Sequence, residues 1–247
     1  MDKLIEKFEK VKDSKDPDEI NDFLIEFGSN PKKEHLFIVD YFIENYNPVI
    51  YRQIKLNLIY FIGQVGIEQS LNDKYLDFLI KEYYSSDRWV RSEIISTLYK
   101  IANHTTFSEN IFDILKYAIL DDYLPISLNA MKVLLLYENI PNETFKKIFK
   151  LFQTPDSTLQ EQISKVLQKF IKNEYHLFEL LNESENYRIL TKKSFRFLLI
   201  TFFNSAMSLS NLESFRELIE NSEWEINNRK IILNEIDTYQ KLLLRTA

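Results

Sequence analysis

The feature that most restricts the fold is an amphipathic helix pattern that recurs along the chain at intervals of 31 to 40 residues. Its clearest copy runs from Asp87 to Ala102, where an aspartate at the expected N-cap precedes apolar residues three and four positions apart. Four apolar positions align between copies. They are Val90, Ile94, Leu98 and Ile101 here, Ile50, Ile54, Leu58 and Phe61 forty residues earlier, and later sets that begin at Ile126 and Leu159. A weaker match, with Ser194 and Thr201 at two of the positions, begins at Leu190. The repetition therefore predicts stacked copies of one helical unit.

The composition fits a chain made of helices. Only 3 of the 247 residues are glycine and 6 are proline, which is too few for the tight turns of an all-β fold. Asp16-Pro17, Asn30-Pro31 and Asn47-Pro48 each place an N-cap acceptor before a proline at the first helical position. We predict about twelve helices. Their expected starts are Asp2, Pro17, Pro31, Pro48, Leu71, Asp87, Ser108, Leu124, Glu143, Asp156 and Leu190, with two more after Leu212 and Trp224.

The segment that contains Asp87, Val90, Arg91, Ile94 and Leu98 resembles the second helix of a HEAT repeat. The pattern of that family has an aspartate at the turn between helices, an arginine a few residues later and a small residue one turn on. Asp87 and Arg91 match it in one repeat. In the following repeat Ala130 matches the small residue, and Asp121 or Asp122 supplies the aspartate.

The resemblance covers residues 31–205 and implies an all-α, right-handed α-solenoid of HEAT/armadillo-like helix pairs. Such pairs cannot bury their apolar faces alone, so each stacks on its neighbours. No linker-like stretch interrupts the pattern, and we therefore expect one continuous domain over residues 1–247. Residues 1–30 are expected to form N-terminal cap helices, residues 31–205 the repeats, and residues 206–247 C-terminal cap helices.

Several chemistries lack the residues that they need. The chain has no cysteine, which excludes disulfides and thiolate metal sites. The three histidines are far apart and show no metal-binding spacing, and no catalytic or phosphate-binding motif occurs. We predict no catalytic residue, no metal and no cofactor, and the sequence favours a protein that is not an enzyme. A catalytic site formed by residues that are distant in the sequence is the open alternative. No signal segment or membrane span is expected, so the predicted setting is cytoplasmic.

Arg91 falls within the apolar arc of its helix, where a charge needs a partner. One interpretation is a structural ladder between repeats, with Asp87 one turn earlier or Asp122 in the next repeat as the partner. The other is an anchor for a phosphate or carboxylate ligand. The ladder is favoured, and it predicts that Arg91→Ala lowers the melting temperature.

Basic residues and one exposed-face tryptophan are the candidate binding residues. Lysines and arginines spaced by three or four share one helix face and suit an anionic partner, although solvated helix faces explain the same pattern. Trp89 lies opposite the apolar stripe, where an aromatic side chain can anchor a partner or pack on a neighbouring helix. The predicted groove contacts are Arg52, Lys55, Arg88, Trp89 and Lys132 in the first half of the chain and Lys165, Lys169, Lys192 and Arg196 in the second.

The predicted function is a non-enzymatic scaffold that binds a protein or peptide along the concave face of the solenoid. The alternative is a nucleic-acid-binding HEAT-like protein related to the alkylpurine DNA glycosylases. The segment Asp87–Arg91 resembles a segment of those enzymes that lies at a repeat aspartate. Those enzymes have a tryptophan-rich cleft and a basic surface, whereas this chain has 2 tryptophans and a formal net charge of −6. Net acidity disfavours nucleic acid, and the partner and oligomeric state stay open.

Overall fold

The computed structural model describes residues 3–28, 31–203 and 208–246. Every regular element in these ranges is helical, and none of their helices has an apolar run long enough to cross a membrane. The α-helices are α1 (Lys3–Val11), α2 (Pro17–Phe27), α3 (Leu36–Asn45), α4 (Pro48–Gly66), α5 (Asp73–Ser85), α6 (Arg88–Ile101), α7 (Glu109–Ala118), α8 (Leu124–Leu134), α9 (Asn142–Lys150), α10 (Ser157–Phe170), α11 (Glu174–Asn182), α12 (Lys192–Phe202), α13 (Ser208–Glu220) and α14 (Ile226–Thr246). Three 3-10 segments join them, η1 (Lys33–His35), η2 (Leu151–Gln153) and η3 (Glu183–Ile189).

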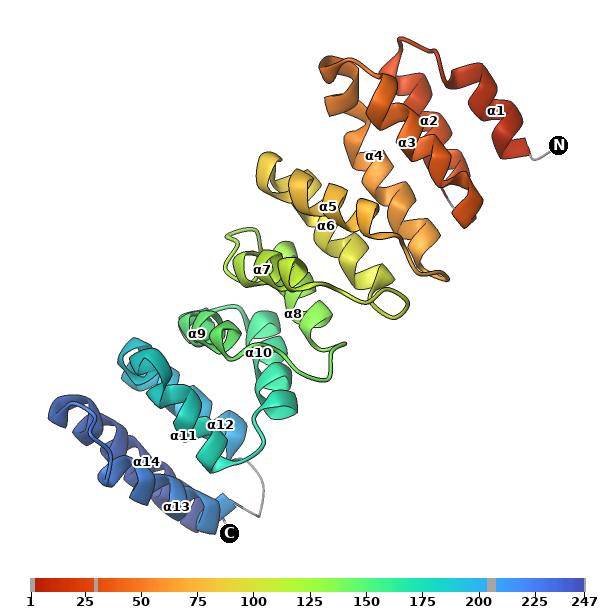
Figure 1. Cartoon of the computed structure of the whole chain (residues 1–247). Helices are drawn as coiled ribbons and strands as arrows, with labels where there is room; N and C mark the ends of the chain where they lie inside the picture. The colour runs from red at the N-terminus through yellow and green to blue at the C-terminus, as the bar shows by residue number, and fades with distance from the viewer. Residues whose placement is uncertain (1–2, 29–30, 204–207, 247) are drawn as a thin grey trace. The chain divides into compact units, whose positions relative to one another are not determined.

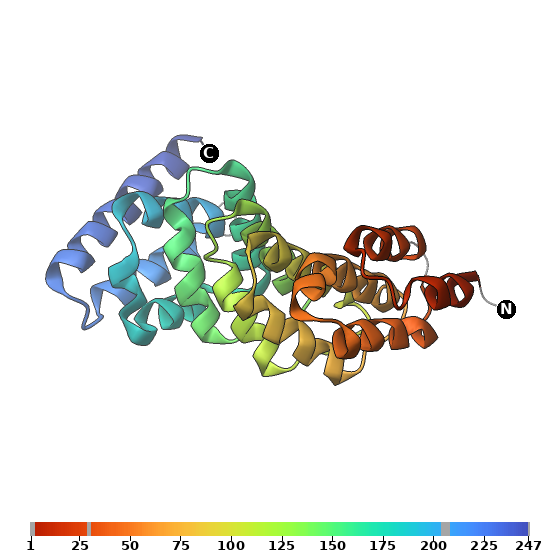
Figure 2. The same cartoon turned by 90° about the horizontal axis from the view of Figure 1, so that it is seen from above.

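The chain divides into two compact units, Met1–Leu136 and Tyr137–Ala247, which we call the N-terminal and C-terminal units. In the N-terminal unit the even-numbered helices pack side by side in the order α2, α4, α6 and α8, and each odd-numbered helix packs on the even-numbered helix that follows it (Figure 1). In the C-terminal unit α10 packs on α12 and α12 on α14, while α11 packs on α13 (Figure 2). Each unit is thus a helical repeat with two helix layers, and a single domain over the whole chain stays a prediction.

Most of the predicted helix starts are confirmed, and three have the expected cap. Asp16, Asn47 and Asp87 each accept a hydrogen bond from the backbone N–H two residues later, at 3.0, 2.9 and 2.9 Å. These contacts satisfy N–H groups that the first turn of a helix leaves unpaired. Asn30 lies outside the described residues.

One helix was missed and two predicted boundaries were wrong. Helix α11 was missed because its apolar residues are spread around the helix and mark no single face. Helix α3 begins at Leu36 and not at Pro31, because a 3-10 turn comes first and the backbone N–H of Lys32 donates to Nδ1 of His35 at 3.0 Å. Helix α13 begins at Ser208, before Leu212.

The aligned apolar positions form the core between neighbouring even-numbered helices. Most of them are at most 8% exposed, and the exceptions are half-buried residues at the ends of the sets, Ile50, Tyr137 and Leu190. Each fully buried aliphatic side chain contributes roughly 1.5–3 kcal/mol relative to exposure. The fully buried members include Ile54, Leu58, Phe61, Ile94, Leu98, Ile101, Ile126, Ala130, Leu134, Ile163, Leu167 and Leu198.

Glycine brings α4 and α6 close together. A Cβ atom on Gly63 would lie 2.8 Å from Oγ1 of Thr97, and one on Gly66 would collide with Cγ2 of Ile101. The close approach lets the buried Thr97 hydroxyl donate to the backbone carbonyl of Ile59 at 3.2 Å. Both glycines therefore serve helix packing, and no described glycine has a positive φ.

Candidate interaction surface and its supporting polar network

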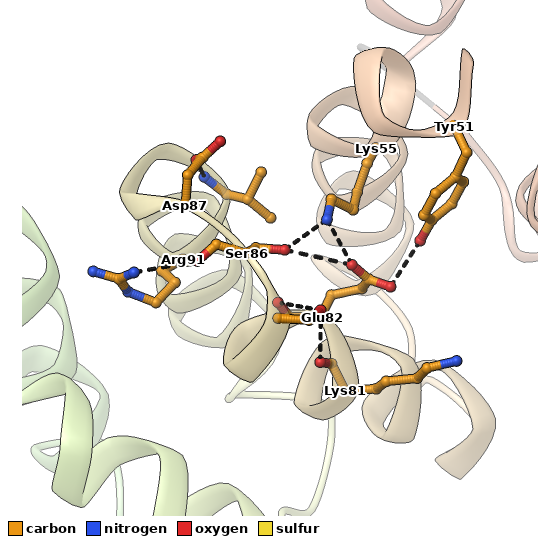
Figure 3. Close-up of polar contacts among 9 residues, drawn as sticks. Tyr51, Lys55, Lys81, Glu82, Ser86, Asp87 and Arg91 are labelled. Atoms are coloured by element: carbon orange, nitrogen blue, oxygen red, sulfur yellow. Dashed lines mark hydrogen bonds and ion pairs between the residues drawn. The ribbon is translucent and has the colours of Figure 1, made fainter. Parts of the chain in front are cut away.

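A buried ion pair ties α4 to the end of α5. The Nζ atom of Lys55 lies 2.8 Å from Oε2 of Glu82, and their side chains are 11% and 9% exposed. The hydroxyl of Tyr51 donates to Oε1 of Glu82 at 3.0 Å, and Lys55 also donates to Oγ of Ser86 at 2.6 Å (Figure 3). Both charges are thus neutralised and hydrogen-bonded, which a buried ion pair requires.

Ser86 continues this network toward α6 and the next repeat. Its backbone carbonyl accepts from Nη1 of Arg91 at 3.2 Å. The same guanidinium contacts Oδ2 of Asp121 through Nε at 3.2 Å and Nη2 at 3.1 Å. Asp121 is the partner and Asp122 is not, while the Asp87 side chain caps α6. Arg91 therefore forms the structural ladder between repeats.

The polar network around Glu82 connects helices and contains no acid or base that is free to react. Both oxygens of Glu82 are occupied, and burial raises the pKa of Tyr51 well above its usual value, so its hydroxyl stays protonated at neutral pH. A cleft of about 250 Å³ adjoins it, and Lys81 on the rim of that cleft points its ammonium away from Glu82 (Figure 3). Across the described ranges, no three His, Asp or Glu side chains are grouped so that they could hold a metal ion.

Arg88 and Trp89 at the start of α6 form a cluster with Tyr123, which directly precedes α8; Arg88 and Trp89 are exposed and Tyr123 is half-buried. The guanidinium of Arg88 lies 4.9 Å from the ring centroid of Trp89 and 5.5 Å from that of Tyr123. The two rings meet edge to face with centroids 5.6 Å apart, and Trp89 is 54% exposed. In the described part of the chain, Arg88 is in contact with no carboxylate. We call these three residues the arginine–aromatic cluster.

The other predicted residues of the N-terminal unit lie in different surroundings. Arg52 is exposed on α4 and, like Arg88, has no ion-pair partner among the described residues. Lys132 is half-buried on α8 and donates to Oδ1 of Asn129 at 3.4 Å. Lys55 is only 9% exposed, so its ammonium supports the fold and is not open to a partner.

In the C-terminal unit, Lys165, Lys192 and Arg196 already have a carboxylate partner. Lys192 and Arg196 contact the two oxygens of Glu235 at 2.9 and 2.7 Å, and Glu235 is 2% exposed. Lys165 pairs with Glu161 at 2.6 Å along α10. The ammonium of Lys169 lies 5.3 Å from the ring centroid of Phe170. Much of the predicted basic surface is therefore neutralised by neighbouring acids.

Sequence reasoning missed Glu82, Ser86 and Tyr123. The sequence does carry a partial signal, because Tyr51 and Lys55 are four residues apart and must share one face of α4. Their partner comes from α5, and only the packing of α5 against α6 brings it within reach. Tyr123 precedes α8 directly, where the pattern suggested a cap and gave no reason to expect an aromatic contact.

Comparison with known proteins shows likeness of fold only. No family model matches the chain, and no curated protein matches it in sequence. The crystal structure of an engineered protein, a target of the Northeast Structural Genomics Consortium, aligns with a TM-score of 0.52 and 14% identity, over 96% of this chain and 98% of that one. Two further engineered proteins from the same consortium align with TM-scores of 0.49 and 0.48 at 13% and 14% identity, over 92% and 96% of this chain and 67% and 100% of theirs.

Proposed function

We propose that the protein is a cytoplasmic, non-enzymatic scaffold, built as a right-handed HEAT/armadillo-like solenoid, that binds a protein or peptide on its even-numbered helices. The observation that carries the proposal is the exposed guanidinium of Arg88, which lies over the Trp89 and Tyr123 rings without a carboxylate partner in the described structure. Arg91, one turn later, has such a partner and is part of the fold. An unpaired arginine beside an exposed tryptophan and a half-buried tyrosine is the composition of a binding hot spot.

The chemistry of this cluster favours a peptide segment with a carboxylate next to an apolar side chain. A guanidinium binds a carboxylate through two parallel hydrogen bonds, and its contact with the two rings limits its rotamers before binding. Trp89 offers an exposed apolar surface for the neighbouring side chain. Arg52 on α4 supplies a second exposed cation on the same layer of helices.

The nucleic-acid alternative has less support. Affinity for nucleic acid comes mainly from cations that neutralise phosphates. Lys55, Lys165, Lys192 and Arg196 each contact a carboxylate instead, which reduces the positive field of the surface. Binding to duplex DNA that weakens steeply with salt would support the alternative, and no binding at low salt would exclude it.

Affinity capture from a native cell extract, with quantitative mass spectrometry, tests the proposal. The full chain is compared with the double variant Arg88→Ala/Trp89→Ala and with a control, Lys81→Ala/Tyr84→Ala. The control also removes one exposed cation and one exposed aromatic ring, but from α5 in the other layer. Partner proteins should be captured in equal amounts by the full chain and the control. The captured amount of the same proteins should be lower by about tenfold or more with the Arg88/Trp89 variant. Equal capture by all three proteins, each with an unchanged melting curve, would overturn the proposal.

A further inference from the structure

The C-terminal unit contains a second candidate site, a cleft of about 490 Å³ between α11 and α13. This volume lies within the range of about 300–1,000 Å³ that is usual for ligand pockets. Its α11 wall carries Tyr175, Phe178 and Asn182, at positions i, i+3 and i+7 of one helix face. The α13 side and the turn after it add Glu217 and Glu223. The cleft therefore combines two aromatic rings with two carboxylates, and none of the described residues that line it is a lysine or arginine.

Its carboxylates are available to a ligand. Glu217 and Glu223 are exposed, and within the described residues neither side chain is in an ion pair or a hydrogen bond. The arginines nearby are already engaged, since Arg188 contacts Glu185 and Glu225, both at 2.9 Å. Arg216 similarly contacts Glu220 at 2.8 Å and Asp237 at 3.0 Å.

The surroundings of the cleft carry an excess of negative charge. Residues 174–185 and 213–225, which include α11 and the second half of α13, contain nine glutamates and one arginine. The net charge of the whole chain hides this asymmetry, because lysines elsewhere in the C-terminal unit balance it. A field of one sign over a cleft favours a ligand of the opposite sign.

A buried tryptophan fixes the aromatic wall. Trp224 is 4% exposed and is stacked between Phe178 and Tyr187, with ring centroids 5.4 and 4.4 Å away and interplanar angles of 14° and 11°. Its indole N–H donates to Oδ1 of Asn182 at 3.0 Å. Phe178 and Asn182, which line the cleft, are thus held by residues beneath them. A wall that is rigid before binding loses less conformational entropy when the ligand arrives.

We propose that this cleft binds a basic peptide, with a lysine or arginine side chain inserted beside Tyr175 and its charge between Glu217 and Glu223. The aromatic ring attracts the cation through its face and packs on the aliphatic stem, and the carboxylates accept its N–H groups. The site shares no residue with the arginine–aromatic cluster, belongs to the C-terminal unit, and selects a partner of opposite charge. It does not rest on the proposed function.

Fluorescence anisotropy with the full chain tests this site. The probe is a fluorescein-labelled octapeptide of alternating arginine and glycine, and the control probe has citrulline in place of arginine. We expect measurable binding of the arginine peptide at 50 mM salt and none of the citrulline peptide. Glu217→Gln/Glu223→Gln should weaken binding roughly fivefold to tenfold. Tyr175→Leu should weaken it roughly threefold, and Tyr175→Phe, which keeps the ring, should retain it.

A matched variant separates a specific site from general attraction to an acidic protein. Glu68→Gln/Glu138→Gln removes the same charge from two exposed glutamates that follow α4 and α8, away from the cleft. Binding at the cleft predicts that this variant leaves the affinity within about twofold. General attraction depends on net charge, so both double variants would weaken it equally. Equal weakening by both double variants, or no binding of the arginine peptide, would overturn the proposal. Melting curves of the variants that match that of the unmodified chain exclude misfolding as the cause. The capture experiment on the arginine–aromatic cluster uses variants of Arg88 and Trp89 and none of the cleft residues. Each proposal can therefore fail without the other.

Discussion

Lys55→Met should destabilise the N-terminal unit strongly. The substitution keeps most of the aliphatic stem and removes the ammonium that lies 2.8 Å from Glu82. Glu82 would then keep its charge at 9% side-chain exposure, with only the neutral hydroxyls of Tyr51 and Ser86 as donors. Removing one partner of a buried ion pair typically costs about 3–5 kcal/mol. Because two donors remain, we expect a loss of about 3 kcal/mol in the free energy of unfolding.

Two further variants isolate the effect of burial. Lys74→Met removes an ammonium at the same distance, 2.8 Å, from Asp40, but Lys74 is 56% exposed and Asp40 31%. That substitution should cost less than about 1 kcal/mol, as exposed pairs usually do. The double variant Lys55→Met/Glu82→Met removes both buried charges and should recover most of the 3 kcal/mol loss, roughly 2 kcal/mol or more.

The assay follows unfolding in urea by tryptophan fluorescence, because each unit contains one tryptophan. Trp89 reports the N-terminal unit and Trp224 the C-terminal unit when the other is replaced by phenylalanine. We expect Lys55→Met to shift the Trp89 transition and to leave the Trp224 transition in place. A shift of less than about 0.5 kcal/mol, or equal effects of Lys55→Met and Lys74→Met, would refute the argument, since both results mean that water reaches the pair.

Two other predictions concern the N-terminal unit. Arg91→Ala should lower its melting temperature by roughly 4–8 °C, because Asp121, whose side chain is 8% exposed, loses its ion-pair partner. An unchanged melting temperature in calorimetry would contradict the ladder between repeats. Burial raises the pKa of Tyr46 to about 12, so the folded protein keeps this proton where the unfolded chain releases it. Stability should therefore fall between pH 10 and pH 12, and urea midpoints measured across this range should fall less steeply for Tyr46→Phe.

The sequence was sufficient to predict the helices and much of their packing. Short-range rules determine where a helix begins and which face is apolar, and both can be read from neighbouring residues. The caps at Asp16, Asn47 and Asp87 and the buried positions Ile94 and Leu98 follow from these rules. Helix α11 was missed because its apolar residues are spread around the helix and mark no single face.

The partners of charged residues could be predicted only in part. The sequence indicates that Arg91 needs an acid nearby, but not that Asp121 supplies it in place of Asp122. Asp121 and Asp122 lie in the non-helical stretch before α8, where side-chain directions follow no fixed period, so packing decides which carboxylate faces Arg91. Lys55 was likewise predicted to be a surface contact, but in the structure Glu82 of α5 lies against its ammonium.

By itself, the sequence determined that this chain forms stacked amphipathic helices, because the spacing of apolar residues is a local property. Only the tertiary structure decided which polar side chains remain open to a partner. Lys55, Lys192 and Arg196 are engaged by carboxylates, whereas Arg88 remains exposed over Trp89. The cleft between α11 and α13 likewise needs two helices that are separated by more than twenty residues of sequence. Exposure and pairing are properties of contacts between distant segments, and a single stretch of sequence does not contain them.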